Sequence, residues 1–146
     1  MAYFLDTNIF VRLLVRDHEQ RYLDCARIFE QIEIDAVGAV TLEAIIAEVI
    51  FVLTSPARYR LSHAEAVANV RPLVELEGVR IEHKRSLLEA LALFESTSLD
   101  FADCLAVAHT RRLGLRGIVS YDRQLARIPG VRWIEPPVPP EDGQDP

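Results

Sequence analysis

FLDTNIF, residues 4–10, joins two apolar runs through three polar residues. Tyr3 to Leu5 is typical of a buried strand, and Ile9 to Val15 has the apolar spacing of a short helix. Asp6 therefore stands where a strand ends and a helix begins. Because ligands of parallel α/β sheets bind beyond the carboxyl ends of the strands, this carboxylate is a candidate site residue.

The rest of the chain alternates short apolar strands with amphipathic helices. We expect strands at 36–40, 79–82, 117–122 and 131–135, and helices at 20–32, 41–53, 62–76, 86–97 and 101–113. Ser62 and Ser86 each precede a Glu by three residues, which predicts a capping box at the start of two helices. The alternation predicts an α/β sandwich with a mainly parallel sheet.

Length and composition indicate one globular domain. The 146 residues are half hydrophobic, and we expect residues 1–134 to form one domain. Residues 135–146 are rich in Pro and acidic, which predicts an extended or disordered tail. Cys25 and Cys104 lack metal-ligand spacing. With no apolar run of bilayer length and no signal-peptide pattern, we expect two reduced thiols, no membrane association and a cytoplasmic location.

The charge is acidic overall but the cations are unusual. A net charge of −6 argues against a large non-specific nucleic-acid footprint. Lys84 is the only lysine, so nearly all positive charge is arginine, which suits bidentate phosphate contacts. Several arginines crowd one segment, and they are either phosphate ligands or plain solvated charges: Arg111, Arg112, Arg116, Arg123 and Arg127.

Three further carboxylates occupy positions comparable to that of Asp6. Asp122 ends the predicted strand at 117–122, two residues after Ser120, and Asp103 lies in the first turn of a helix. Glu48 is flanked by apolar residues in a helix, where a charge is costly without a cation or a cavity. Converging carboxylates repel one another unless a cation binds, and Mg²⁺ or Mn²⁺ prefers such oxygen ligands. The set predicts a divalent metal site.

Asp6 and Glu48 also have purely structural interpretations. Asp6 could serve only as the N-cap of the following helix. Glu48 could be a solvated residue at a gap in an apolar helix face, and Glu43 is a competing candidate five residues earlier.

The later acids have structural interpretations too. Asp100 and Asp103 have the spacing of a capping pair, with Asp100 as the cap and Asp103 favoured by the helix dipole. Asp122 could simply open a short helix at 123–126. Each signal alone is weak, and the set of four is what favours a site.

The order of these motifs resembles that of PIN-domain nucleases, most closely the VapC toxin ribonucleases of VapBC toxin–antitoxin pairs. The similar segments are FLDTNIFVRLLV (4–15), TLEAIIAEVIFVL (41–53), LDFADCLAVAHTRRLG (99–114) and IVSYDRQLARIPGV (118–131). The resemblance covers roughly residues 1–134. It implies a three-layer α/β/α sandwich with a short, mainly parallel central sheet.

The resemblance also implies roles for individual residues. Asp6, Glu48, Asp103 and Asp122 match the four family acids, which would act in catalysis and bind Mg²⁺ or Mn²⁺, and Glu48 is preferred over Glu43. Supporting roles fall to four neighbours, of which Asn8 would hydrogen-bond the carboxylates and Asp100 would hold a metal-bound water: Thr7, Asn8, Asp100 and Ser120.

By the same resemblance the protein is a metal-dependent endoribonuclease, the toxin of a type II toxin–antitoxin pair. Its partners would be an RNA substrate, a VapB-like antitoxin and a second copy in a homodimer. A catalytically silent PIN-fold binding module is the main alternative. A haloacid-dehalogenase-type phosphatase is disfavoured because Asn8 stands where its second Asp is needed, and a receiver domain because the expected late Lys is missing.

Overall fold

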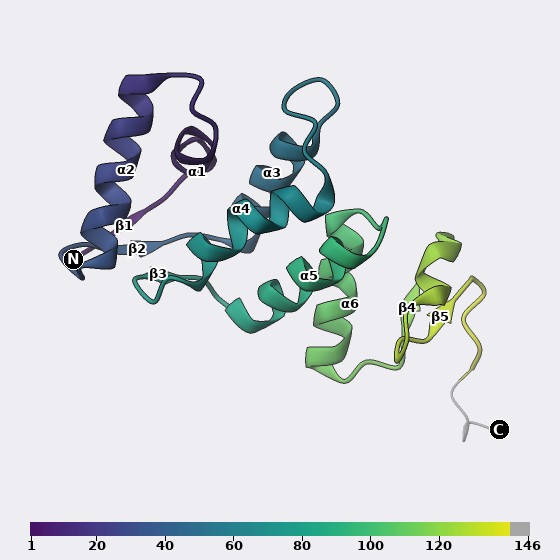
Figure 1. Cartoon of the computed structure of the whole chain (residues 1–146). Helices are drawn as coiled ribbons and strands as arrows, with labels where there is room; N and C mark the ends of the chain where they lie inside the picture. The colour runs from purple at the N-terminus through teal and green to yellow at the C-terminus, as the bar shows by residue number, and fades with distance from the viewer. Residues whose placement is uncertain (141–146) are drawn as a thin grey trace.

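The computed structural model describes residues 1–140, in which short strands alternate with helices (Figure 1). The predicted order of elements is confirmed, with ends shifted by a few residues. The strands are β1 (Ala2–Phe4), β2 (Gly38–Val40), β3 (Val79–Arg80), β4 (Ile118–Val119) and β5 (Trp133–Ile134). The helices are α1 (Thr7–Leu14), α2 (Glu19–Glu33), α3 (Glu43–Thr54), α4 (His63–Glu75), α5 (Lys84–Ser96), α6 (Phe101–Leu113) and the 3₁₀ helix η1 (Arg123–Arg127).

One of the two predicted capping boxes forms. At α4 the Ser62 hydroxyl accepts the Glu65 N–H at 3.1 Å, and the Glu65 carboxylate accepts the Ser62 N–H at 2.8 Å. The box predicted at Ser86 was wrong, because α5 begins at Lys84 and buries Ser86. His83, with φ 55°, turns the chain into α5, and Lys84 Nζ donates to the Leu76 carbonyl at 2.9 Å.

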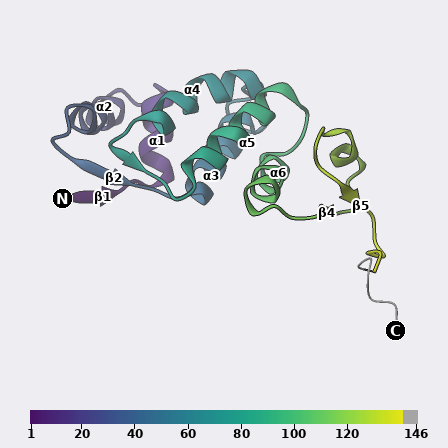
Figure 2. The same ribbon diagram turned by 90° about the horizontal axis from the view of Figure 1, so that it is seen from below.

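Every strand pairing within residues 1–140 is parallel, in line with the mainly parallel sheet that was predicted, but the strands form two sheets. One sheet has the order β1-β2-β3, with Tyr3 opposite Ala39 and Ala39 opposite Val79, and the other pairs β4 with β5. In Figures 1 and 2 the two sheets lie at opposite ends of the molecule, with α3, α4, α5 and α6 between them. β1 and β4 are therefore both edge strands.

The core is made mainly by helices. α3 runs through it and buries Ile46, Val49, Ile50 and Leu53. α5 packs on α4 and α6, and α1 packs on α2 and α3. α2 buries Cys25, Phe29 and Ile32, whereas Leu23 is 47% exposed.

Gly114 follows α6, which ends at the predicted residue 113, and the chain then continues into the second sheet. Gly114 has a left-handed φ of 63°, and its N–H returns to the carbonyls of Thr110 and Arg111. Three residues later, a Cβ on Gly117 would collide with the Arg132 carbonyl across the β4–β5 pair. None of the helices in residues 1–140 combines the length and apolarity that crossing a bilayer requires.

Candidate active site

Two predicted acids meet at the N-terminal end of the fold, and we call Asp6 and Glu48 the N-terminal acid pair. Asp6 follows β1 and caps α1, where its Oδ1 accepts the Thr7 N–H at 2.8 Å. Thr7 is 6% exposed, and its hydroxyl donates to Glu48 Oε2 at 2.7 Å. Asp6 is therefore an N-cap, as the structural interpretation proposed. Thr7, which Asp6 caps, also links Asp6 to a second carboxylate, that of Glu48 on α3.

Three other acids meet at the start of α6, and we call Asp100, Asp103 and Asp122 the C-terminal acid cluster. Burial raises the pKa of Asp103, and the nearby carboxylates of Asp122 and Asp100 raise it further. Asp100 is the N-cap residue of α6, yet its side chain makes no capping hydrogen bond. The predicted role of Asp100 as a side-chain cap is therefore wrong, and its carboxylate is not committed to the helix.

The turn after β4 fixes the position of Asp122. The Ser120 hydroxyl accepts the Asp122 N–H at 3.0 Å, and Asp122 Oδ1 accepts the Gln124 N–H at 3.0 Å, which opens η1. The Trp133 indole N–H donates to the Ser120 carbonyl at 2.9 Å and so ties this turn to β5. Ser120 thus acts through the backbone of Asp122.

Glu43, the competitor of Glu48, has a structural partner. Arg112 Nε donates to His109 Nδ1 at 3.1 Å, so His109 Nε2 carries the ring proton and donates to Glu43 Oε2 at 2.7 Å. This chain of hydrogen bonds fastens α6 to the start of α3. Glu43 is therefore engaged by His109, and the preference for Glu48 as a site residue stays a prediction.

Asn8, which was expected to hydrogen-bond the acids, is exposed on α1. It lines a hollow between α1 and α2 together with Ile9, Arg12, Arg21, Asp24 and Cys25. In this structure Thr7 hydrogen-bonds a site carboxylate, the role expected of Asn8. Thr7 and Asn8 are adjacent polar residues, but Thr7 is buried and Asn8 is exposed.

The structure holds the predicted acids in two groups. Within residues 1–140, no three side chains among His, Cys, Asp and Glu are gathered closely enough to bind a single metal ion. The closeness of Asp103 and Asp122 nonetheless suits Mg²⁺ or Mn²⁺, which commonly binds through one or two carboxylates and completes its shell with water and phosphate. The donor chemistry of this pair fits a hard divalent cation, and the four-acid metal site stays a prediction.

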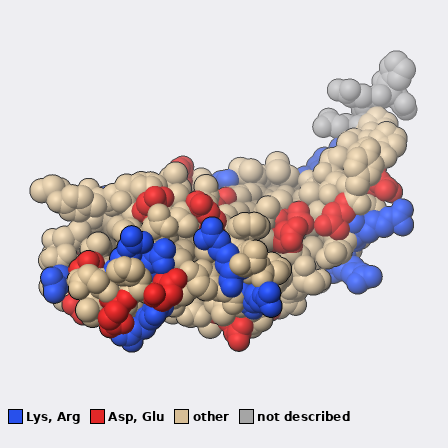
Figure 3. All heavy atoms as spheres, turned by 90° about the horizontal axis from the view of Figure 1, so that it is seen from above, with Lys and Arg blue, Asp and Glu red and all other residues tan. Residues whose placement is uncertain are grey.

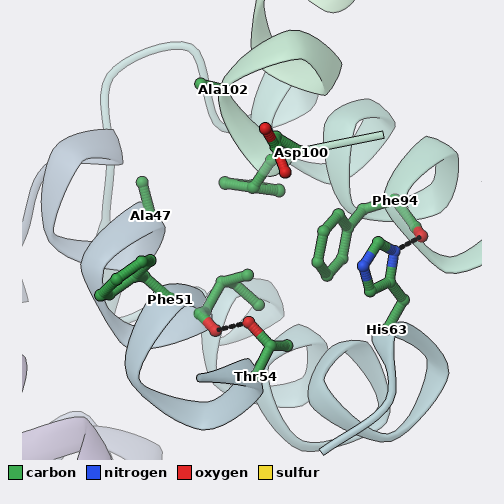
Figure 4. A pocket seen from close by; sticks show the side chains of 9 residues that line it. Ala47, Phe51, Thr54, His63, Phe94, Asp100 and Ala102 are labelled. Atoms are coloured by element: carbon green, nitrogen blue, oxygen red, sulfur yellow. Dashed lines mark hydrogen bonds between the residues drawn. The ribbon is translucent and has the colours of Figure 1, made fainter. Parts of the chain in front are cut away.

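A pocket that sequence reasoning missed lies beside the C-terminal acid cluster, with Asp100 in its wall. It has a volume of about 370 Å³, and its walls come from α3, α4, α5 and α6, with Phe51, His63, Phe94 and Asp100 among its lining residues (Figure 4). Phe51 is 70% exposed although α3 is otherwise strongly buried. The sequence signal that could have indicated this position is that Phe51 follows Glu48 by one helical turn. The apolar residues around Phe51 in the sequence instead favoured a position in the core.

Most of the chain matches a known domain family. The PIN domain model matches residues 3–131, so the chain belongs to the PIN domain family and the predicted fold class is confirmed. The chain is similar to a VapC ribonuclease from Aquifex aeolicus (strain VF5), with 22% identity over 132 residues that cover 90% of this chain and 95% of that protein.

Among solved structures, the chain is similar to the Mycobacterium tuberculosis toxin VapC20, whose structure is described as that of a sarcin-ricin loop cleaving toxin. The identity is 18% and the TM-score is 0.40, with 86% of this chain and 93% of that chain covered. The predicted resemblance to VapC-type PIN domains is therefore confirmed by the family match and the curated relative.

Proposed function

We propose that this protein is a Mg²⁺- or Mn²⁺-dependent endoribonuclease of the VapC type, the toxin of a type II toxin–antitoxin pair. The observation that carries the proposal is the C-terminal acid cluster, where Asp103 is partly buried against two other carboxylates. Such an arrangement gains free energy from a bound cation. The similarity to a VapC ribonuclease supports RNA as the substrate.

We assign each acid a role in the reaction according to its position in the structure. Asp103 and Asp122 would hold the cation, which would supply an activated water at neutral pH and neutralise charge that develops on the phosphate. Glu48, fixed by the Thr7 hydroxyl, is exposed on α3 and would accept a proton from the attacking water. Asp6 would complete the set of four, Ser120 would hold the Asp122 turn, and Asp100 would orient a water.

The two acid groups would come together if the two sheets joined. β1 and β4 are both edge strands of parallel sheets, and both carry exposed apolar side chains, with Tyr3 55%, Phe4 54% and Val119 51% exposed. Parallel sheets are normally buried on both faces. If β4 pairs in parallel with β1, Asp122 and Asp6 stand side by side at one sheet edge.

Cysteine cross-linking tests this pairing. In a variant with Phe4→Cys and Val119→Cys, we expect an oxidant to form one new disulfide, and the mass of the product distinguishes pairing within one chain from pairing between two copies. The matched control combines Leu23→Cys with Val119→Cys, since Leu23 is exposed on α2. A failure of the first pair to cross-link more than the control would leave Asp103 and Asp122 as the only cation ligands.

The partners follow the same proposal. A VapB-like antitoxin would inhibit the enzyme, the protein would form a homodimer, and it would act in the cytoplasm. Both cysteines, Cys25 and Cys104, are free and buried, which supports a reducing compartment.

Charges of both signs alternate over the face drawn in Figure 3, so that face does not offer a continuous basic surface for RNA.

The decisive experiment is cleavage of a panel of structured and single-stranded RNAs by purified protein. We expect cleavage with MgCl₂ or MnCl₂ and none with EDTA, while Asp103→Asn, still folded, cleaves at no more than background. A wild-type protein that binds an antitoxin normally but cuts no RNA with either metal would establish a silent binding module instead.

A further inference from the structure

The pocket between α3, α4, α5 and α6 has the size and walls of a ligand site rather than of a packing defect. Its volume of about 370 Å³ falls in the range of small-molecule pockets, about 300–1,000 Å³. Figure 4 shows Phe51 on one side, the stacked rings of His63 and Phe94 on the other, and Asp100 at the end of the space between them. An aromatic pocket of this volume has room for a flat ring.

The walls of this pocket are rigid. The His63 and Phe94 rings stack with centroids 3.7 Å apart, and His63 Nδ1 lies 3.0 Å from the Phe94 carbonyl and 2.9 Å from the Thr97 carbonyl. These contacts lock the imidazole to the end of α5. Phe51 stands on α3, whose inner face is fully buried, so only its exposed ring can adjust.

The pocket borders the proposed active site through Asp100, which lines it. Two of its lining residues, Ala47 and Ala102, directly precede Glu48 and Asp103 in the sequence, and Asp100 belongs to the C-terminal acid cluster. A ligand in the pocket is therefore held next to groups from both α3 and α6.

The carboxylate of Asp100, at the rim of the pocket, favours ligands that can donate a hydrogen bond. Asp100 is exposed and its side chain makes no cap hydrogen bond, so its carboxylate can accept a hydrogen bond from a ligand. Adenine, cytosine and guanine carry amino groups that donate to a carboxylate, while uracil presents carbonyl oxygens where cytosine has its amino group. A flat ring with an amino edge complements both features.

We propose that this pocket binds one unpaired base of the RNA substrate, stacked on Phe51, with Asp100 accepting a hydrogen bond from the amino edge of the base. The inference rests on the proposed ribonuclease function and deepens it. RNA is recognised mainly through unpaired bases that stack on aromatic side chains. Asp100 would repel a phosphate but attracts an amino group, so the pocket selects the base rather than the backbone. An apolar peptide side chain would use the aromatic walls but would give Asp100 no donor.

The first test removes the stacking ring. In EDTA, which stops cleavage, we expect Phe51→Ala to weaken binding of a fluorescent single-stranded RNA about tenfold, whereas Phe51→Trp keeps wild-type affinity. With metal, we expect Phe51→Ala to raise KM about tenfold with kcat changed less than threefold. Leu23→Ala, which removes an exposed apolar side chain on α2, is the matched control and is expected to bind as wild type.

The second test varies the base. RNAs that differ at one unpaired position near the cut are compared, and we expect wild type to cleave the uracil version at least fivefold more slowly than the best amino-bearing base. Asp100→Asn offers an amide that also donates, so we expect it to narrow this difference to within twofold.

The outcomes separate the two proposals. If wild type cuts no RNA, the ribonuclease function fails, while the binding measurements in EDTA still report on the pocket. If wild type cuts RNA and Phe51→Ala binds and cleaves within twofold of it, the base pocket is overturned. Loss of antitoxin inhibition in Phe51→Ala with unchanged RNA binding would also overturn it and assign the pocket to the peptide partner.

Discussion

Asp6 and Glu48 are linked through the buried hydroxyl of Thr7, which donates to Glu48, whereas Asp103 faces two further carboxylates, Asp100 and Asp122. A neutral donor stabilises the ionised form of an acid without any cation, and neighbouring like charges destabilise it. The comparison teaches that the N-terminal acid pair is organised by the fold alone. The C-terminal acid cluster is organised at an electrostatic cost that a proton or a cation relieves.

The largest expected effect comes from removing the charge at the centre of the cluster. We expect Asp103→Asn to lower the RNA cleavage rate at least 100-fold, because the proposed cation loses one of its two nearest ligands. We also expect 10 mM Mg²⁺ to raise the melting temperature of wild type but not of this variant, since a ligand that binds only the folded state stabilises it.

Glu89→Gln is the control for that charge change, because Glu89 is exposed on α5 and is not among the charges that raise the pKa of Asp103. We expect it to cleave at the wild-type rate and to keep the Mg²⁺ effect. Equal cleavage by Asp103→Asn and Glu89→Gln would contradict a role for the cluster in the reaction.

Breaking the link within the N-terminal acid pair should have the next largest effect. Thr7→Val keeps the shape of the side chain but removes the donor to Glu48, and we expect it to lower the free energy of unfolding by about 1–2 kcal/mol and cleavage about tenfold. Urea denaturation and initial cleavage rates measure both.

The control for Thr7 is Thr54→Val, since the Thr54 hydroxyl only bonds the Ile50 carbonyl of its own helix at 2.8 Å. We expect it to change stability by less than about 0.5 kcal/mol, the usual range for such sites. A Thr7→Val protein as stable as Thr54→Val and as active as wild type would show that the bond to Glu48 does not matter.

Stability of the metal-free protein should depend on pH through Asp103. Its folded pKa lies above the ordinary 3.8, so the native state holds more protons than the unfolded chain between 3.8 and the raised value. The free energy of unfolding therefore falls as pH rises through that window. We expect Asp122→Asn to shrink this fall and to stabilise the protein at pH 7 by about 1 kcal/mol.

Urea titrations at several pH values in EDTA measure this effect, with Glu89→Gln as the reference for loss of a remote charge. Identical pH profiles for wild type and Asp122→Asn would mean that the two carboxylates do not interact in solution.

The smallest expected effect lies at Ser120, which acts on Asp122 only through the backbone. Ser120→Ala removes the acceptor of the Asp122 N–H, and we expect cleavage to fall two- to fivefold with the metal requirement unchanged. A loss as large as that of Asp103→Asn would instead indicate direct contact of the hydroxyl with substrate or metal.

Local patterns predicted much of the fold. The Ser62 capping box, the end of α6 at Gly114 and the order of strands and helices follow from interactions within a few residues, so the sequence is sufficient to predict them. The Ser86 box failed because a second local signal, the turn at His83 with Lys84 bonded to carbonyls, started the helix earlier and buried the serine.

The site was predictable as a set of acids but not as an arrangement. Strand ends and helix starts marked Asp6, Asp103 and Asp122 as candidates, because such positions depend on local periodicity. That Thr7 rather than Asn8 bonds a carboxylate, and that Glu43 is engaged by His109, depends on which faces of α1, α3 and α6 pack together.

By itself, the sequence determined the α/β class, the order of the elements, the parallel pairing and the identity of the acids, because these depend on spacing along the chain. Only the tertiary structure decided that the strands divide into two sheets, that the acids stand in two groups, and that Phe51 faces an open pocket. These features depend on contacts between residues tens of positions apart, and no local pattern encodes which of the possible long-range packings has the lowest free energy.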